Sequence, residues 1–130
     1  MDHNIDFLTQ DGFRQIKDYP RYFINSSGKI YNTRSNIFMK AAIIDASKSH
    51  DLRLNLCNQT VRRTLAVKHL VAETFPEMIF HAVEEGKYLL HKNGDYLNCD
   101  ASNLVYCNKK PKGGRELILW LSFLFHLWEM

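Results

Sequence analysis

The chain has 130 residues, of which 45% are hydrophobic, and a formal net charge of +3. This length fits one compact domain or two small modules that share a core. The mild basic excess is compatible with nucleic acid, but it excludes little because many soluble proteins are slightly basic. The polar N-terminus shows no signal peptide, and the apolar run from Leu117 to Trp128 is shorter than the roughly 20 residues of a membrane span. We therefore expect an intracellular protein, cytoplasmic or nucleoid-associated, with no membrane segment.

Three cysteines are present, Cys57, Cys99 and Cys107, and no two of them form a C-x-x-C pair. An odd number of cysteines argues against a closed disulfide framework and favours reduced thiols. A zinc site built on Cys99 and Cys107 needs two further ligands at spacings that zinc sites do not normally use.

Short strands and turns fill the first half of the chain. Residues 1–12 are expected to be an irregular lead-in that ends at an Asp-Gly turn. Residues 22–24 and 29–31 predict a β-hairpin, because an Asn-Ser-Ser-Gly turn cluster separates them. Residues 37–39 and 41–44 are further possible strands.

A second hairpin is expected between residues 52 and 67. Residues 52–56 alternate apolar and polar side chains, and residues 61–67 form the return strand. Arg53, Arg62 and Arg63 are expected to point outward, either as a plain solvated face or as phosphate contacts.

The second half begins with a short helix over residues 68–75, which Pro76 ends. Residues 77–87 are a connecting loop or a short helical turn. Residues 88–90 and 104–106 are strand-like, with an Asn-Gly turn signal between them, and residues 115–128 predict an apolar helix.

The segment from His91 to Leu104 resembles the core of phage-type HNH homing endonucleases. That pattern has a histidine, a glycine-containing loop, an asparagine seven residues later, and an Asn-Leu pair at twelve and thirteen. Asn98, Asn103 and Leu104 stand at these offsets.

Two upstream segments, residues 19–30 and 67–75, resemble the nuclease-associated module that often precedes this core. Phe13 stands where a tryptophan is usual, and Lys68 and His69 stand in a His-Arg position. The resemblance covers residues 13–108 and implies an α+β fold: a small β-hairpin module, a ββα-metal (His-Me finger) hairpin and an apolar C-terminal helix. The implied divisions are a lead-in (1–12), the module (13–76), the hairpin (77–114) and the helix (115–130).

The resemblance also implies chemistry. His91 would be the general base in phosphodiester hydrolysis, since a neutral imidazole titrates near working pH. Asn103 would fix the loop, Asn98 would brace it, and Gly94 would permit a tight backbone turn. An active enzyme would need a divalent metal such as Mg²⁺.

The metal positions depart from the family pattern. The residue before the histidine is usually acidic and is Leu90 here, and the second ligand position falls on Lys112. Hard cations need oxygen ligands, so substitutes would have to come from Asn108, Glu116, Asp95 or Asp100.

Three functions therefore stay open: an HNH-type DNA endonuclease, a catalytically inactive relative that binds nucleic acid or a host protein complex, and a protein-interaction module. DNA is the expected partner. The expected phosphate contacts are Arg53, Arg62, Arg63, Lys68, Lys109, Lys110 and Lys112. The C-terminal helix is apolar nearly all round, so it is either a core helix or a homodimer or protein-complex interface. Its anchors would be Trp120, Phe123 and Trp128.

Overall fold

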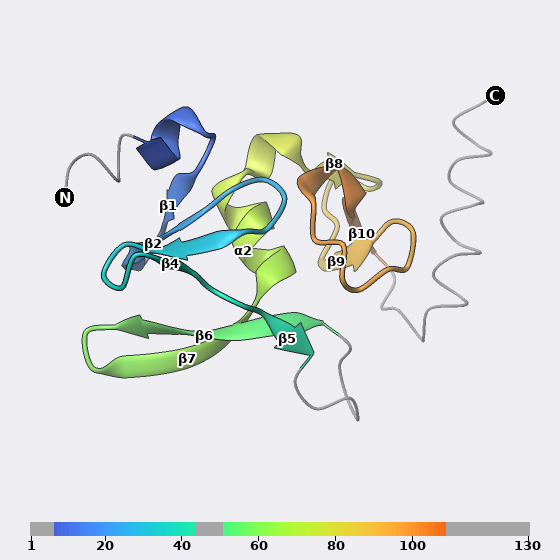
Figure 1. Ribbon diagram of the computed structural model, residues 1–130. Helices are drawn as coiled ribbons and strands as arrows, with labels where there is room; N and C mark the ends of the chain where they lie inside the picture. Colours follow the sequence, from blue (N-terminus) through green and yellow to red (C-terminus); the bar gives the residue numbers. More distant parts are fainter. Residues whose placement is uncertain (1–6, 44–50, 109–130) are drawn as a thin grey trace.

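The computed structural model describes residues 7–43 and 51–108. In these ranges the chain forms three small sheets around one central helix, α2 (Figure 1). Strands outnumber helices in the described ranges, which confirms the expected α+β class in its broad sense. The expected helix over 115–128 lies outside the described residues. No helix in the described part of the chain is long and apolar enough to cross a membrane.

The first sheet is an antiparallel meander in the order β1-β2-β3-β4. Its strands are β1 (Arg14–Ile16), β2 (Tyr19–Ile24), β3 (Ile30–Asn32) and β4 (Ile37–Phe38). The predicted hairpin is confirmed, since Ile24 pairs with Ile30. Asn25 shapes its turn, because its Oδ1 accepts hydrogen bonds from the backbone N–H groups of Ser27 and Lys29. Residues 7–10, expected to be irregular, are helical.

The second sheet contains β5 (Ala42–Ile43), β6 (Leu52–Asn58) and β7 (Val61–Ala66) in that order, all antiparallel. The predicted pairing of the two long strands is confirmed, with Asn58 opposite Val61 across a two-residue turn. Gln59 in this turn has a positive φ of 56°, the left-handed conformation that tight hairpin turns require.

Helix α2 (Val67–Thr74) follows β7 directly and lies at the centre of the molecule (Figure 1). Its apolar residues recur at the helical period, and Val67, Leu70, Val71 and Ala72 are buried. The predicted helix is confirmed, although it begins one residue earlier and stops at Thr74. Pro76 cannot continue the helix and instead opens the short 3-10 helix η1 (Pro76–Met78).

The third sheet holds the hairpin on which the resemblance depends. It contains β8 (Phe80–His81), β9 (Tyr88–His91) and β10 (Leu104–Cys107) in the order β8-β10-β9. β9 and β10 are antiparallel, as expected, whereas β8 pairs with β10 in parallel and was not predicted. Gly86 permits this arrangement, because a Cβ there would come within 2.8 Å of the backbone of β10.

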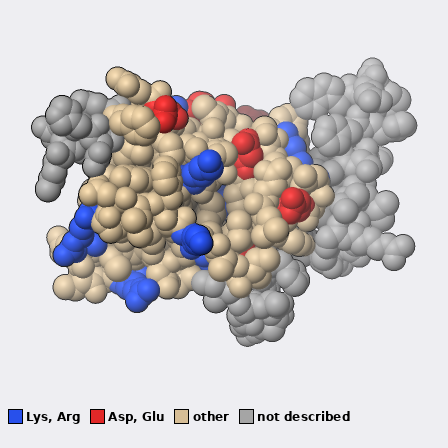
Figure 2. Space-filling model, in the orientation of Figure 1, with Lys and Arg blue, Asp and Glu red and all other residues tan. Residues whose placement is uncertain are grey.

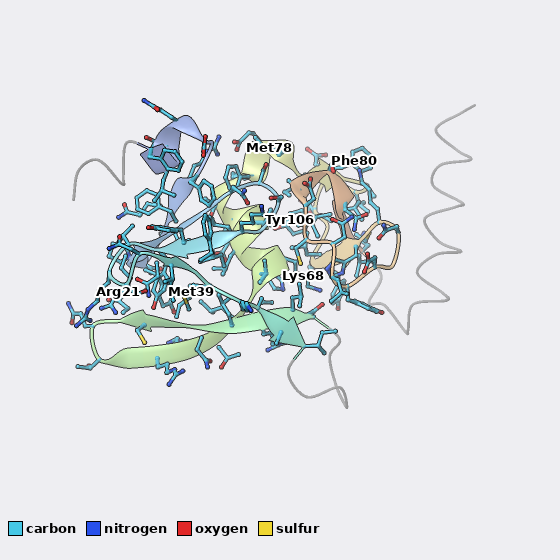
Figure 3. The ribbon with its side chains drawn as sticks, in the orientation of Figure 1. Arg21, Met39, Lys68, Met78, Phe80 and Tyr106 are labelled. Carbon is cyan, nitrogen blue, oxygen red and sulfur yellow. The ribbon has the colours of Figure 1, made fainter. Side chains whose placement is uncertain are left out.

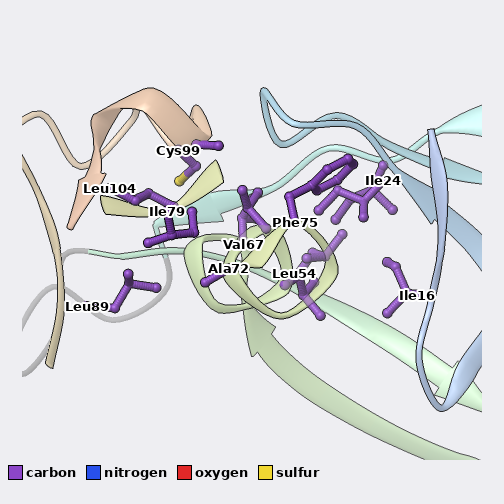
Figure 4. Close-up of a cluster of buried hydrophobic side chains, with 14 of the residues drawn as sticks. Ile16, Ile24, Leu54, Val67, Ala72, Phe75, Ile79, Leu89, Cys99 and Leu104 are labelled. Atoms are coloured by element: carbon purple, nitrogen blue, oxygen red, sulfur yellow. The ribbon is translucent and has the colours of Figure 1, made fainter. Parts of the chain in front are cut away.

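One continuous hydrophobic core joins the three sheets through α2 (Figure 4). Ile24 from the first sheet, Leu54 from the second and Leu89 from the third belong to the same buried cluster. The two predicted modules therefore share a core across residue 76.

Candidate functional site

His91 stands at the end of β9, opposite Leu104, the first residue of β10. Successive side chains of a strand point to opposite faces. Leu90 accordingly lies on the other face of β9, in a small buried cluster with Val105 and Cys107. His91, the expected general base, and Leu90, which stands in the usual metal-ligand position, thus lie on opposite faces of β9.

Asn103 holds the loop between these strands closed. Its Nδ2 donates to Asn93 Oδ1 (3.0 Å) and to the backbone carbonyl of Asn98 (2.9 Å). Its Oδ1 accepts from the backbone N–H of Asn93 at 3.3 Å. The side chain is only 8% exposed, so every polar atom in it is used where water is scarce. Asn103 lies where a loop-fixing residue is expected.

The rest of the loop is shaped by short-range hydrogen bonds from side chain to backbone. Asn93 Oδ1 accepts from the N–H of Asp95, and Asn98 Oδ1 accepts from the N–H of Asp100. Asp100 in turn caps η2 (Ala101–Asn103) by accepting from the N–H of Ser102. Gly94 has a φ of +76°, a conformation that a residue with a side chain rarely adopts. Asn98 therefore braces the loop through its side chain as well as its backbone carbonyl.

The imidazole of His91 is 1% exposed and is enclosed by its own loop. Its Nε2 lies 3.8 Å from the Sγ of Cys99, and its ring meets Tyr96 edge to face at a centroid distance of 5.4 Å. Burial, together with the positive charge of Lys68, lowers the pKa of His91 to about 4, although Asp51 and Asp95 act in the opposite direction. His91 is therefore neutral at neutral pH.

Cys99 was not singled out as a neighbour of His91 in the sequence. Burial raises the pKa of its thiol to about 11, so the thiol is protonated at neutral pH. Cys99 lies in the loop just before η2, which leads the chain back to β10 beside His91. No spacing in the sequence signals this contact, nor that of Tyr96.

Lys68 was expected to contact phosphate, and in the structure its ammonium is paired with a carboxylate and largely covered. Its Nζ lies 3.0 Å from Asp51 Oδ1, and the two side chains are only 12% and 16% exposed. In Figure 3, Lys68 lies near the start of α2, between the second sheet and the β9–β10 hairpin. Asp51, just before β6, is a further residue near the site that the sequence analysis did not single out.

The three arginines of the β6–β7 hairpin do not all point outward together, which corrects a further expectation. Arg53 pairs with Ala66 and Arg62 with Cys57, so both lie on the outer face of the sheet. Arg63 pairs with Leu56 and lies on the opposite face, beside a surface hollow that Asp18 and Tyr19 also line. Arg62 and Arg63 are exposed, whereas Arg53 is half-buried and its Nε is fully covered.

The residue just before the histidine, where the resemblance places a metal ligand, cannot bind a divalent metal. Leu90 is 4% exposed, and a buried hydrocarbon side chain offers no ligand to a hard cation. Of the substitutes, Asn108 and Asp95 are exposed and Asp100 caps η2. Among the residues described by the structure, no three His, Cys, Asp or Glu side chains lie close enough to share a metal ion.

Several expected site residues lie outside the described residues. These are the second metal position Lys112, the substitute ligand Glu116, the basic residues Lys109 and Lys110, and the interface candidates Trp120, Phe123 and Trp128.

Comparison with known proteins relates this arrangement to one group of enzymes. A scan against models of known protein families finds no match. Among curated proteins, the chain is 30% identical over 95 residues, 73% of its length, to an uncharacterized HNH endonuclease of Acanthamoeba polyphaga mimivirus. The chain spans 22% of the length of that relative.

A solved structure gives the same relationship. The chain is similar to the HNH homing endonuclease I-HmuI, in a structure that concerns DNA binding and cleavage by that enzyme. The TM-score is 0.59 and the identity 28%, and the match covers 72% of this chain and 51% of that one. The resemblance predicted from His91, Asn103 and the upstream segments is confirmed.

Proposed function

Because the chain is related to the HNH endonucleases, we propose that it binds DNA with an HNH-type scaffold and does not cleave it. The observation that carries the proposal is the burial of Leu90 in an apolar cluster, at the position where the family usually has an acidic metal ligand. The DNA-binding part follows from the relatedness, since the similar enzyme I-HmuI binds DNA.

The enclosure of His91 supports the same reading. A general base must come within hydrogen-bond distance of the water or hydroxyl whose proton it takes. His91 is 1% exposed and its Nε2 faces a protonated thiol, so the loop would have to open before the imidazole met a substrate. The hydrogen bonds of Asn103 oppose that opening.

The charged surface supports binding through the phosphate backbone. Figure 2 shows Lys and Arg side chains spread singly over one face of the molecule, with a few Asp and Glu side chains among them. Arg62 and Arg63 are exposed. Among the expected phosphate contacts that the structure describes, these two side chains could reach DNA without moving. Lys109, Lys110 and Lys112 would add to this surface.

Metal-dependent DNA cleavage is the second candidate. It is favoured by the neutral state of His91, which is the state that a general base needs, and by the ordered loop that Asn103 holds around it. It requires metal ligands at shifted positions, with His91 as the base.

Two assays on the same purified chain separate the candidates. The first measures binding of a labelled DNA duplex by fluorescence anisotropy in chelator, over a series of salt concentrations. We expect binding that weakens steeply as salt rises. The second incubates supercoiled plasmid with Mg²⁺ or Mn²⁺, and we expect no nicking.

The opposite outcomes are equally definite. Nicking that needs metal and disappears in a His91→Ala variant would establish the endonuclease. A folded protein with no affinity for DNA or RNA at low salt would refute both candidates and favour a protein-interaction module.

A further inference from the structure

The ion pair of Lys68 with Asp51 has an unusual setting for two charged side chains. Lysine is rarely this covered unless it is paired, because removing an ammonium from water is costly. Both partners here are more than four-fifths covered. Asp51 is the one ion-pair partner that Lys68 has among the residues described by the structure.

The ion pair lies beside the His91 site. The charges of Lys68 and Asp51 both act on the imidazole of His91 and on the thiol of Cys99. Figure 3 places Lys68 on the side of α2 that faces the β9–β10 hairpin. A DNA phosphate that approached the end of β9 would therefore come under the influence of this ammonium.

The stability of α2 does not explain why a lysine stands at position 68. The N-terminal end of a helix carries partial positive charge, so a cation in the first turn is unfavourable and an anion is favourable. Lys68 is the second residue of α2, and no acidic residue stands in that first turn. Asp51, just before β6, supplies the anion that pairs with this ammonium.

We propose that the Asp51 carboxylate occupies a phosphate-binding position, and that Lys68 exchanges it for a DNA phosphate oxygen beside His91. A carboxylate and a phosphate offer a lysine the same kind of partner, an anionic oxygen. The intact ion pair lowers DNA affinity, because the contact with Asp51 must be given up when DNA binds. This inference rests on the proposed DNA binding.

The test compares two variants that each remove one negative charge. Asp51→Asn releases Lys68, and Glu77→Gln breaks the other ion pair of the described chain, between Arg14 and Glu77 on η1. DNA affinity is measured by anisotropy over a salt series, with the thermal unfolding midpoint of each variant as the check on folding. We expect Asp51→Asn to bind DNA about threefold to tenfold more tightly than wild type, and Glu77→Gln to change affinity by less than about twofold.

Removal of the lysine gives the second arm, which does not depend on how well Asp51→Asn folds. Lys68→Gln is expected to weaken binding and to lower the slope of log affinity against log salt by about one, because one phosphate contact is lost. Asp51→Asn combined with Lys68→Gln should bind no better than Lys68→Gln alone.

The failures are distinguishable. Equal affinities for Asp51→Asn and Glu77→Gln, or a gain that persists without Lys68, would overturn the exchange and leave DNA binding intact. An unchanged salt slope in Lys68→Gln would do the same. A wild-type chain that does not bind DNA would overturn the proposed function and this inference together.

Discussion

The two faces of β9 differ in how closely they match the HNH pattern that the sequence resembles. On one face, the buried imidazole of His91 lies beside Cys99 and the Asn103 loop, and the charges of Lys68 and Asp51 act on it. On the other, Leu90 packs with Val105 and Cys107 where the family usually places a metal ligand. The loop around His91 thus matches the pattern that the resemblance implies, whereas the position expected for a metal ligand is buried among apolar side chains.

The sharpest test of this contrast puts a carboxylate back on the apolar face. At neutral pH, Leu90→Asp should lower the free energy of unfolding by about 4 kcal/mol, because it buries an ionised group without a partner. Burial raises the folded-state pKa of such a carboxyl above the unfolded value, so the loss should shrink as pH falls towards 4. Urea denaturation at several pH values measures it.

Leu90→Ala separates the effect of charge from that of the cavity. It should cost about 2–3 kcal/mol at every pH. If added Mn²⁺ stabilises Leu90→Asp but not Leu90→Ala, the face still accepts a metal. If Leu90→Asp is as stable as wild type at neutral pH, the Leu90 face is open to water and the contrast between the faces fails.

The His91 face predicts a pH dependence of opposite sign. The pKa of His91 is lowered from 6.5 to about 4 in the folded state. Between these two pH values the unfolded chain therefore binds a proton at His91 that the folded chain does not bind. The free energy of unfolding should therefore fall between pH 6.5 and 4, by at most about 3 kcal/mol, and level off below that.

His91→Gln is the variant that isolates this effect, and it should flatten the profile in that window. Burial also lowers the pKa of His69, so His69→Gln is the matched control and should remove a smaller part of the slope. A profile that is as steep in His91→Gln as in wild type would mean that the imidazole is hydrated in solution.

Asn103 is expected to contribute next. Asn103→Ala removes three hydrogen bonds and leaves the backbone carbonyl of Asn98 without its amide donor, so it should cost about 2–3 kcal/mol. Thermal or urea denaturation measures the loss. Asn58→Ala is the control, because Asn58 is exposed and its amide makes one hydrogen bond, to the carbonyl of Asp18, so its loss should be below about 1 kcal/mol. Similar losses in the two variants would argue against a locked loop.

The smallest effects on stability are expected on the β6–β7 hairpin. Arg62→Ala and Arg63→Ala should each change the free energy of unfolding by less than about 0.5 kcal/mol, since both side chains are exposed. Arg62→Ala should weaken DNA binding by about threefold, measured by anisotropy. Arg63→Ala should weaken it less, because Asp18 lines the same hollow and offsets the positive charge. A larger loss in Arg63→Ala would place DNA on the inner face of the hairpin instead.

Local patterns in the sequence account for most of the fold. The alternation over residues 52–56 and the turn residues at 25–28 predicted the two hairpins, and the period of Leu70 and Val71 predicted α2. β8 escaped prediction because two residues are too few for a pattern, and its partner β10 is distant in the sequence. The backbone also approaches β10 closely at Gly86, where no side chain larger than hydrogen fits.

The site was less predictable, because its important contacts join distant residues. His91 and Asn103 were named from a resemblance, and the structure places them at the two ends of the loop between β9 and β10. The ion pair of Asp51 with Lys68 and the contact of Cys99 with His91 depend on tertiary packing, which no spacing encodes. Arg62 and Arg63 are both exposed, as expected, but they lie on opposite faces of the sheet because neighbouring side chains of a strand alternate.

The shared core has a consequence for how this site behaves as a piece of protein. Leu89 and Leu104, which flank the His91 loop, belong to the same buried cluster as Ile24 and Leu54. The β9–β10 hairpin cut out alone would expose these side chains to water and lose the packing that orders its strands. We therefore expect the His91 site to fold only within the stretch from β1 to β10. A transfer of this site to another protein would have to include α2.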